Sequence, residues 1–400
     1  MKAVLINSWY GCKSTGNLVK EFHDYLVSEG NDVSVFFGHG NSVDDFQVYK
    51  VNTQFDFYSH VLLSRLSGYQ GCFSTRNTKK LIKYIDSFDP DVVYLFNLHA
   101  YYLNEFMLLD YLKQKRVKVV YMLFDEYPYL GKCCFSQQCE KFMVECRDCP
   151  DIKGYPTSMF FDRSNFFYNK KKELFSDWKE LTLAGVQFLS ERAKLSAIAK
   201  DVKFSVLDMG VALNRTYYPR PTEKLREKLQ IPAENKVVVT VGQNSDSRKG
   251  IDKFYEVAKL CLNDKITFVH IGFNGKDKTG IPADCIPISY VSNQDELAEY
   301  YSLADVYVMT SSGEAMSLTC MESLGCGCKL VGFDISGTPY SASEEFGTFV
   351  PYNDLQAFAD AVRKTCKKSE ESIRASREYA LSRYEISDFV KNLEKIGSEN

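Results

Sequence analysis

The sequence has no long apolar run, no marked excess of charge, no internal repeat and no low-complexity segment. No stretch approaches the roughly 18 apolar residues of a membrane-spanning helix. Residues 1–7 turn polar too early for a secretory signal peptide. The net charge is only −3 and the Lys and Arg residues are scattered, which argues against nucleic acid as the main partner. We therefore expect a cytoplasmic protein.

A disulfide framework is not expected either. The 13 cysteines are odd in number and irregularly spaced, and a chain of 400 residues with 45% apolar residues can bury a large core without them. Cys261, Cys320 and Cys366 are predicted to be small core residues. The length suggests more than one domain.

Apolar strand-like runs alternate with amphipathic segments, and the pattern restarts in the second half. Such alternation predicts parallel strands with helical crossovers, here two Rossmann-like, doubly wound α/β domains that face each other across a cleft. We place the domains at 1–217 and 218–378, with a final helix at 379–400 that crosses back to the first. The expected strands are 2–7, 32–37, 91–96, 117–123, 236–241, 266–272, 305–310 and 329–333; the expected helices are 16–28, 79–86, 251–262, 296–303, 318–324 and 355–364.

A Ser-Thr-Gly loop follows the first strand. Ser14, Thr15 and Gly16 are predicted to cap the next helix, so that its free N–H groups favour an anion in the cleft. This is not a Walker A loop, because Cys12 separates Gly11 from Lys13. The alternative is an ordinary tight turn.

The corresponding loop of the second half carries Arg248 and Lys249. Two cations at this place could stabilise the charge that develops on a diphosphate leaving group without a metal ion. Arg-Lys before a helix is otherwise a solvated turn.

Two glutamates eight residues apart, Glu314 and Glu322, follow a predicted strand. Glu314 lies in a Ser/Gly loop, where it could accept sugar hydroxyls. Glu322 lies about one turn into a short helix that Ser317 and Leu318 open, where it could accept both hydroxyls of a ribose while the first N–H groups hold phosphate. The alternative is two solvated surface residues.

Taken together, these motifs resemble a family 4 glycosyltransferase, retaining and of GT-B fold, of the bacterial polysaccharide-assembly type. The resemblance covers nearly the whole chain. Its further motifs are Asn97-Leu-His-Ala100, Asp125-Glu-Tyr-Pro128, Met209-Gly-Val211 and Ser336-Gly-Thr-Pro339.

The resemblance implies a retaining hexosyltransferase with a UDP- or GDP-sugar on the second domain and a glycan or lipid-linked acceptor on the first. Lys249 and Arg248 would match the basic pair on the diphosphate, Glu314 the sugar-contacting glutamate and Glu322 the ribose-contacting one. No divalent ion is required in such enzymes. An epimerase or hydrolase of the same fold, or a non-catalytic sugar-nucleotide-binding protein, is the alternative.

Two residues of the first domain are candidates for the acceptor side. His99 matches the histidine of the family's Asn-x-His segment, and Asp125 could bind an acceptor hydroxyl or act as a base. The alternatives are a structural histidine and an aspartate that caps the next turn. The family often has histidine where this chain has Phe124, and Met316 and Ser317 replace its usual phenylalanine and proline, which leaves the sugar open.

A cysteine-rich insert at about 131–150 contains Cys146-Arg-Asp-Cys149, a spacing that lets two thiolates bind one ion. Cys133 and Cys139 could complete a structural zinc site, and similar relatives carry cysteines at these four positions. Free thiols or a redox pair are the alternatives.

Aromatic and basic residues are mixed at 159–161, 166–168 and 170–172. Such mixing could dock on the inner face of an anionic membrane. The alternative is a helix with a buried aromatic face and a solvated lysine end.

Overall fold

The computed structural model describes residues 1–136, 139–275 and 280–399. Residues 137–138 of the predicted cysteine-rich insert and residue 400 of the predicted final helix lie outside this range. The chain forms two compact units: unit 1 comprises Met1–Asp208 and Val390–Asn400, and unit 2 comprises Met209–Phe389. None of the described helices is long and apolar enough to cross a membrane.

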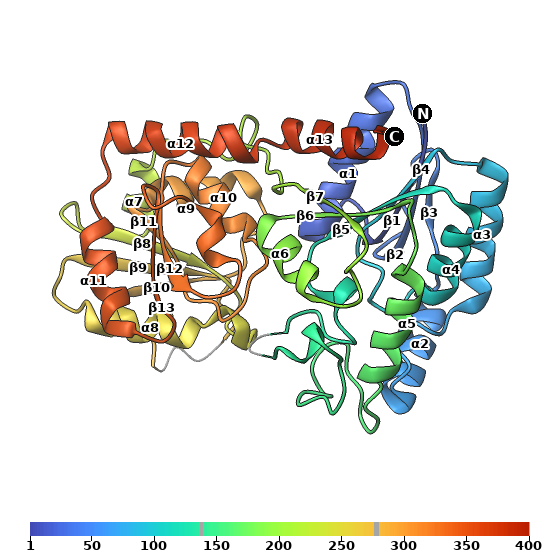
Figure 1. Cartoon of the computed structure of the whole chain (residues 1–400). Helices are drawn as coiled ribbons and strands as arrows, with labels where there is room; N and C mark the ends of the chain where they lie inside the picture. The colour runs from blue at the N-terminus through green and yellow to red at the C-terminus, as the bar shows by residue number, and fades with distance from the viewer. Residues whose placement is uncertain (137–138, 276–279, 400) are drawn as a thin grey trace. The chain divides into compact units, whose positions relative to one another are not determined.

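Unit 1 is built on a parallel sheet of seven strands in the order β3-β2-β1-β4-β5-β6-β7 (Figure 1). Helices cover it, and α3, α4 and α5 contact one another in turn. The strands are β1 (Lys2–Trp9), β2 (Asp32–His39), β3 (Val48–Lys50), β4 (Val92–Leu95), β5 (Lys118–Leu123), β6 (Leu181–Gly185) and β7 (Lys203–Val206). The α-helices are α1 (Lys13–Ser28), α2 (Gln54–Ser67), α3 (Thr75–Phe88), α4 (Glu105–Lys115), α5 (Ser164–Phe175) and α6 (Gln187–Leu195).

Unit 2 has a second parallel sheet, of six strands in the order β10-β9-β8-β11-β12-β13. Its helices α8 and α11 pack together, as do α9 and α10. The strands are β8 (Lys236–Val241), β9 (Ile266–Ile271), β10 (Cys285–Ile288), β11 (Val306–Met309), β12 (Lys329–Asp334) and β13 (Gly347–Pro351). The α-helices are α7 (Glu223–Lys228), α8 (Ile251–Leu260), α9 (Gln294–Leu303), α10 (Leu318–Gly325), α11 (Leu355–Thr365), α12 (Glu370–Tyr384) and α13 (Ile386–Ser398), whose last part belongs to unit 1.

The core of unit 2 explains why these segments fold as they do. Strand β8 reads Lys-Val-Val-Val-Thr-Val, a β-branched run that suits a central strand covered on both faces. Phe254 of α8 and Phe358 of α11 insert onto the same sheet, where the Phe358 and Phe333 rings lie 4.8 Å apart. Cys261, Cys320 and Cys366 are buried, which confirms the prediction that they are core residues.

The structure corrects one local prediction and narrows another. Helix α1 begins at Lys13 after the extended residue Cys12, so Ser14, Thr15 and Gly16 lie inside its first turn instead of capping it. The segment 166–172 lies within α5, where Phe167, Tyr168 and Lys171 are buried. A docking surface cannot include these three side chains, whereas Phe166 and Lys172 are exposed, so membrane contact of this segment stays a prediction.

The chain enters and leaves unit 2 at neighbouring points. The Val211 N–H donates to the carbonyl of Tyr384 at 2.8 Å, and the Ile386 N–H donates to the carbonyl of Val211 at 3.0 Å. Residues after 389 then rejoin unit 1, where the Tyr25 hydroxyl of α1 donates to Glu394 at 2.7 Å.

Candidate functional site

The loop between β8 and α8 is tied to the loop that follows β11. A short 3₁₀ turn at Ser247–Lys249 begins after Asp246, whose Oδ1 accepts the Arg248 N–H at 3.1 Å. The carbonyl of Arg248 accepts the Ser312 N–H at 2.8 Å. Gly250 has φ +60°, and a Cβ there would lie 2.1 Å from the carbonyl oxygen of Thr310. Only glycine permits this close approach of two loops.

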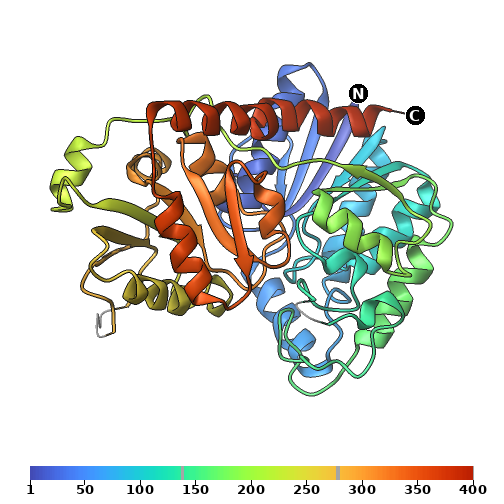
Figure 2. The ribbon, with the colours of Figure 1, turned by 60° about the vertical axis from the view of Figure 1, so that its left-hand side comes forward.

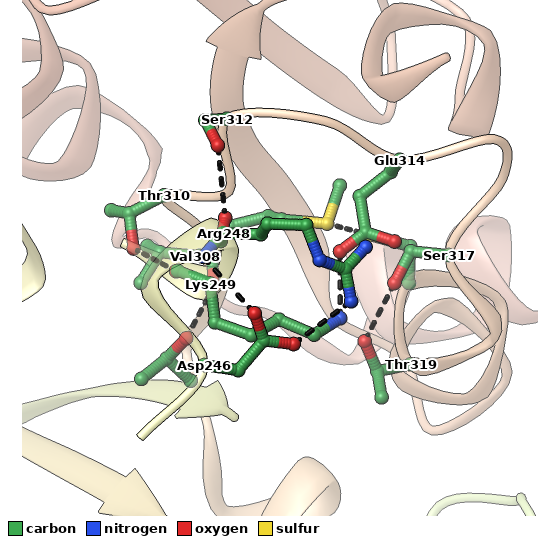
Figure 3. A network of polar contacts seen from close by, with 12 residues as sticks. Asp246, Arg248, Lys249, Val308, Thr310, Ser312, Glu314, Ser317 and Thr319 are labelled. Carbon is green, nitrogen blue, oxygen red and sulfur yellow. Dashed lines mark hydrogen bonds and ion pairs between the residues drawn. The ribbon is translucent and has the colours of Figure 1, made fainter. Parts of the chain in front are cut away.

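The approach brings Lys249 and Glu314 together. Lys249 Nζ lies 2.6 Å from Glu314 Oε1, and the two side chains are 27% and 12% exposed (Figure 3). Their loops meet because β8 and β11 are neighbours and both loops leave the carboxyl ends of the strands, where parallel α/β sheets bind ligands. The pair is partly desolvated, so its charges act more strongly than they would in water.

Arg248 does not join this pair. Its guanidinium bonds Asp246 Oδ2 at 2.8 Å and is 40% exposed. The two predicted diphosphate ligands therefore differ in the structure: Lys249 faces the sugar-contacting candidate Glu314, and Arg248 lies against a carboxylate of its own loop.

A second turn supports Glu314 from behind. The Gly337 N–H donates to the carbonyl of Glu314 at 2.8 Å. A Cβ at Gly337 would lie 1.8 Å from the carbonyl oxygen of Ala315, whereas one at Gly313 would meet only Ser336 Oγ, at 3.8 Å. The Ser336-Gly337 turn thus fixes the backbone that carries Glu314.

Helix α10 begins beside this loop with unpaired N–H groups. Ser317 is its N-cap, in extended conformation, but its side chain makes no capping bond and instead shares a hydrogen bond of 2.8 Å with the Thr319 hydroxyl. The first amides of a helix are unpaired within it and favour an anion. The phosphate contacts predicted for Ser317 and Leu318 stay predictions.

Glu322 lies deeper in the same helix and has separate partners. It is buried, and the Tyr301 hydroxyl donates to its Oε2 at 2.8 Å. Burial raises the pKa of the Glu322 carboxyl to about 7, while hydrogen bonds from Tyr301 and Tyr217 act in the opposite direction. The two tyrosines were not anticipated from the sequence, because nothing in the spacing relates them to Glu322.

In unit 1, His99 and Asp125 form one cluster. His99 Nε2 lies 2.8 Å from Asp125 Oδ2, and the Tyr155 hydroxyl lies 3.3 Å from His99 Nδ1. Asp125 Oδ1 also accepts the Tyr127 N–H at 2.9 Å. One oxygen of this aspartate therefore caps the next turn, while the other orients His99. Sequence reasoning named His99 and Asp125 singly but missed Tyr155.

A buried polar network lies behind this cluster. The Tyr127 hydroxyl donates to Glu105 at 2.5 Å, and Lys171 Nζ donates to the carbonyl of Tyr127 at 2.6 Å. Burial raises the pKa of Glu105 and lowers that of Lys171, and each group's charge opposes the other's shift. The network fixes the backbone after Asp125.

Thr15 and Gly16 belong to unit 1, in the first turn of α1. A Cβ at Gly16 would lie 3.0 Å from that of Trp9, so the helix start packs closely on the end of β1. The predicted anion contact at these residues stays a prediction.

The four cysteines proposed as zinc ligands lie near one another. Burial raises the pKa of Cys133 to about 12, and the neighbouring Cys146 and Cys149 add to that shift. Among the described residues, however, ligand atoms gather within 4.8 Å of one another only at His99, Asp125 and Cys134. The cysteines are thus neighbours that are not drawn together to ligand spacing.

The comparison with protein families decides the class of unit 2. Residues 221–382 match the family described as glycosyl transferases group 1. This segment is therefore similar to group 1 glycosyltransferases. The matched range contains Lys249, Glu314, Glu322 and the start of α10.

Curated relatives of the group 1 domain align over part of their lengths. A putative colanic acid biosynthesis glycosyl transferase of Escherichia coli K12, WcaC, is 29% identical over 25% of this chain and 25% of its own. A putative teichuronic acid biosynthesis glycosyltransferase of Bacillus subtilis 168, TuaC, is 24% identical over 50% of this chain and 52% of its own. The chain thus spans a quarter to about half of the length of these relatives.

Solved structures match the whole chain and show the fold. WaaG, a glycosyltransferase involved in lipopolysaccharide biosynthesis, superimposes with a TM-score of 0.67 at 15% identity, over 100% of both chains. HepE of Anabaena in complex with UDP-glucose gives 0.63 at 13% identity, over 99% of this chain and 100% of its own. The prediction of two Rossmann-like α/β domains of GT-B type is confirmed.

Proposed function

We propose that the protein is a retaining glycosyltransferase of family 4 that moves a hexose from a UDP- or GDP-sugar to a glycan or lipid-linked acceptor. We place this reaction in surface polysaccharide biosynthesis, in the cytoplasm at the inner face of a membrane. The names of two curated relatives, which concern colanic acid and teichuronic acid, support this assignment, as does the UDP-glucose bound by HepE.

The observation that carries the proposal is the Lys249–Glu314 pair beside the start of α10. We expect a diphosphate that accepts hydrogen bonds from the N–H groups at the helix start to reach Lys249, which is bonded to Glu314 of the adjoining loop. Glu314 would then release Lys249 to the phosphate and accept hydroxyls of the sugar instead. Preorganised donors aimed at developing charge are usually the largest source of rate enhancement.

The reaction needs no metal ion in this scheme. The bond between the anomeric carbon and the diphosphate oxygen breaks, and a bond from that carbon to the acceptor oxygen forms on the same face. The acceptor proton passes to the leaving diphosphate. On unit 1, His99 held by Asp125 is the group we assign to orienting the acceptor or the transferred sugar.

Thermal shift across UDP-, GDP-, ADP- and dTDP-sugars tests the donor site. We expect one donor class to raise the melting temperature, and Glu322→Gln to abolish that increase, because a ribose would lose its charged acceptor. Since burial raises the pKa of Glu322 to about 7, the wild-type shift should grow between about pH 6 and about pH 8, as the carboxyl ionises.

Glu256→Gln is the matched control, because this glutamate lies exposed on α8 and forms an ion pair with Lys259. Equal donor shifts in the wild type and the Glu322 variant would overturn the ribose assignment. Free sugar or an epimer formed without acceptor would instead identify a hydrolase or epimerase.

We also propose that one structural zinc ion is bound by four cysteines, Cys133, Cys139, Cys146 and Cys149. The ion would have to draw neighbouring thiols to a common centre and deprotonate them. We expect about one zinc per chain in protein purified without chelator. The Cys146→Ser/Cys149→Ser variant should lose the metal, and Cys12→Ser, at an exposed site, should keep it. Zinc below about 0.2 per wild-type chain excludes the site.

A further inference from the structure

Helix α2 exposes its apolar face to solvent. Its residues Phe55, Tyr58, Leu62 and Leu66 recur at helical spacing and are all exposed, Phe55 at 79%. The opposite face carries the buried polar residues of the helix, His60 and Ser64. A surface helix normally turns its apolar stripe inward, so the reversed pattern indicates an apolar partner.

The loop 159–161 extends this stripe. Met159, Phe160 and Phe161 are exposed, Phe160 at 64%. The Met159 N–H donates to the carbonyl of Arg65 at 2.9 Å, so the loop is fixed to the end of α2. Both views of the ribbon show α2 beside the irregular segment that precedes α5 (Figures 1 and 2). We call α2 together with residues 159–161 the apolar rim.

Arginines flank the apolar rim. Arg65 and Arg76 are exposed. Hydrogen bonds from Thr53 lower the pKa of Asp56, at the start of α2, and the charge of Arg76 adds to that shift. The guanidinium of Arg163 lies over the rings of Tyr69 and Phe161, at 4.5 and 5.1 Å from their centres. Asp56 itself is bound to Thr53 in a capping box. Aromatic and aliphatic side chains beside cations favour the interface of an anionic bilayer.

The inner side of the apolar rim adjoins the His99–Asp125 cluster. His60 of α2 lies 5.8 Å from the Tyr101 ring, and Tyr101 lies 6.1 Å from Tyr155, measured between ring centres. The Tyr155 hydroxyl contacts His99 at 3.3 Å. One layer of aromatic rings therefore separates the exposed stripe from the candidate acceptor site.

We propose that the apolar rim is a bilayer-binding surface, by which unit 1 enters an anionic lipid interface and receives an acceptor whose lipid part stays in that bilayer. Receipt of a lipid-linked acceptor rests on the proposed function, whereas the binding of the apolar rim to lipid does not. A twofold self-contact through the same surface would set its arginines against one another, which makes a second copy the poorer occupant.

Co-sedimentation of the full chain with vesicles tests the surface. We expect binding to phosphatidylcholine vesicles that contain about one third phosphatidylglycerol, and weaker binding at high salt or to phosphatidylcholine alone. The variant Phe55→Ser/Leu62→Ser/Phe160→Ser should lose more than about tenfold in vesicle affinity, because three apolar side chains no longer enter the lipid.

Leu195→Ser/Val206→Ser is the matched control: these residues are 52% and 58% exposed in unit 1 but belong to α6 and β7. It should bind vesicles as the wild type does. Unchanged melting temperatures and donor shifts in both variants separate lipid binding from folding and from the donor site. The proposal is overturned if the rim variant binds like the wild type, if the wild type ignores anionic vesicles, or if the rim variant only converts a dimer into a monomer.

Discussion

Lys249→Ala should lower kcat/KM for sugar transfer by about 10²- to 10³-fold, the loss typical of one removed charge-stabilising donor. Lys249 is bonded to Glu314 at 2.6 Å in the free protein, and its side chain is partly buried. The positive charge of Lys249 would stabilise the negative charge that develops on the diphosphate as the glycosidic bond breaks. We therefore expect the loss mainly in kcat, with a smaller change in the dissociation constant of the donor, measured by steady-state kinetics and calorimetry.

Lys259→Ala is the control for this experiment. Lys259 forms an ion pair of similar length with Glu256, 2.7 Å, on the same unit, but both side chains are about half exposed. Exposed pairs of this kind contribute little. A Lys249 variant that transfers sugar within about threefold of the wild type would show that the pair has no part in catalysis.

Gly337→Ala should both destabilise unit 2 and abolish transfer. The new Cβ would lie 1.8 Å from the carbonyl oxygen of Ala315, so the backbone that carries Glu314 must move. Overpacking against fixed backbone costs about 3 kcal/mol. For a unit of this size we expect the melting temperature to fall by roughly 5–10 °C, measured by scanning calorimetry.

Gly313→Ala places the same methyl group in the neighbouring loop, next to Glu314, where the nearest contact, with Ser336 Oγ, is at 3.8 Å. It should keep the melting temperature of the wild type. Equal effects of the two substitutions would mean that the Ser336-Gly337 turn does not support Glu314.

Strands β8, β9, β11 and β12 and helices α8 to α11 of unit 2 were predicted because pattern and packing agree there, whereas β10, β13 and α7 were not predicted. The β-branched run Lys236–Val241 and the amphipathic segment that begins at Ile251 lie where the sequence predicts β8 and α8. Helix α2 could not be found in this way, because its polar residues His60 and Ser64 face inward and its apolar residues face outward. Strand β3 has only three residues and leaves no periodic signal.

The residues of the candidate site could be predicted from the sequence, but the contacts between them could not. Lys249 and Glu314 meet because β8 lies next to β11 in the sheet, and strand order is not written in a local pattern. For the same reason the sequence could not show that Tyr301 bonds Glu322. Local motifs identify residue types, whereas the tertiary fold decides which charges neutralise one another.

The junction at Val211 and Tyr384 has a consequence for how the protein is made. Unit 2 interrupts unit 1 in sequence, and its two ends are hydrogen-bonded to each other. On the ribosome, residues 209–389 are therefore all synthesised before the segment that carries Glu394 can reach Tyr25 on α1. The contact between α13 and α1 can therefore form only after the whole of unit 2 has been synthesised.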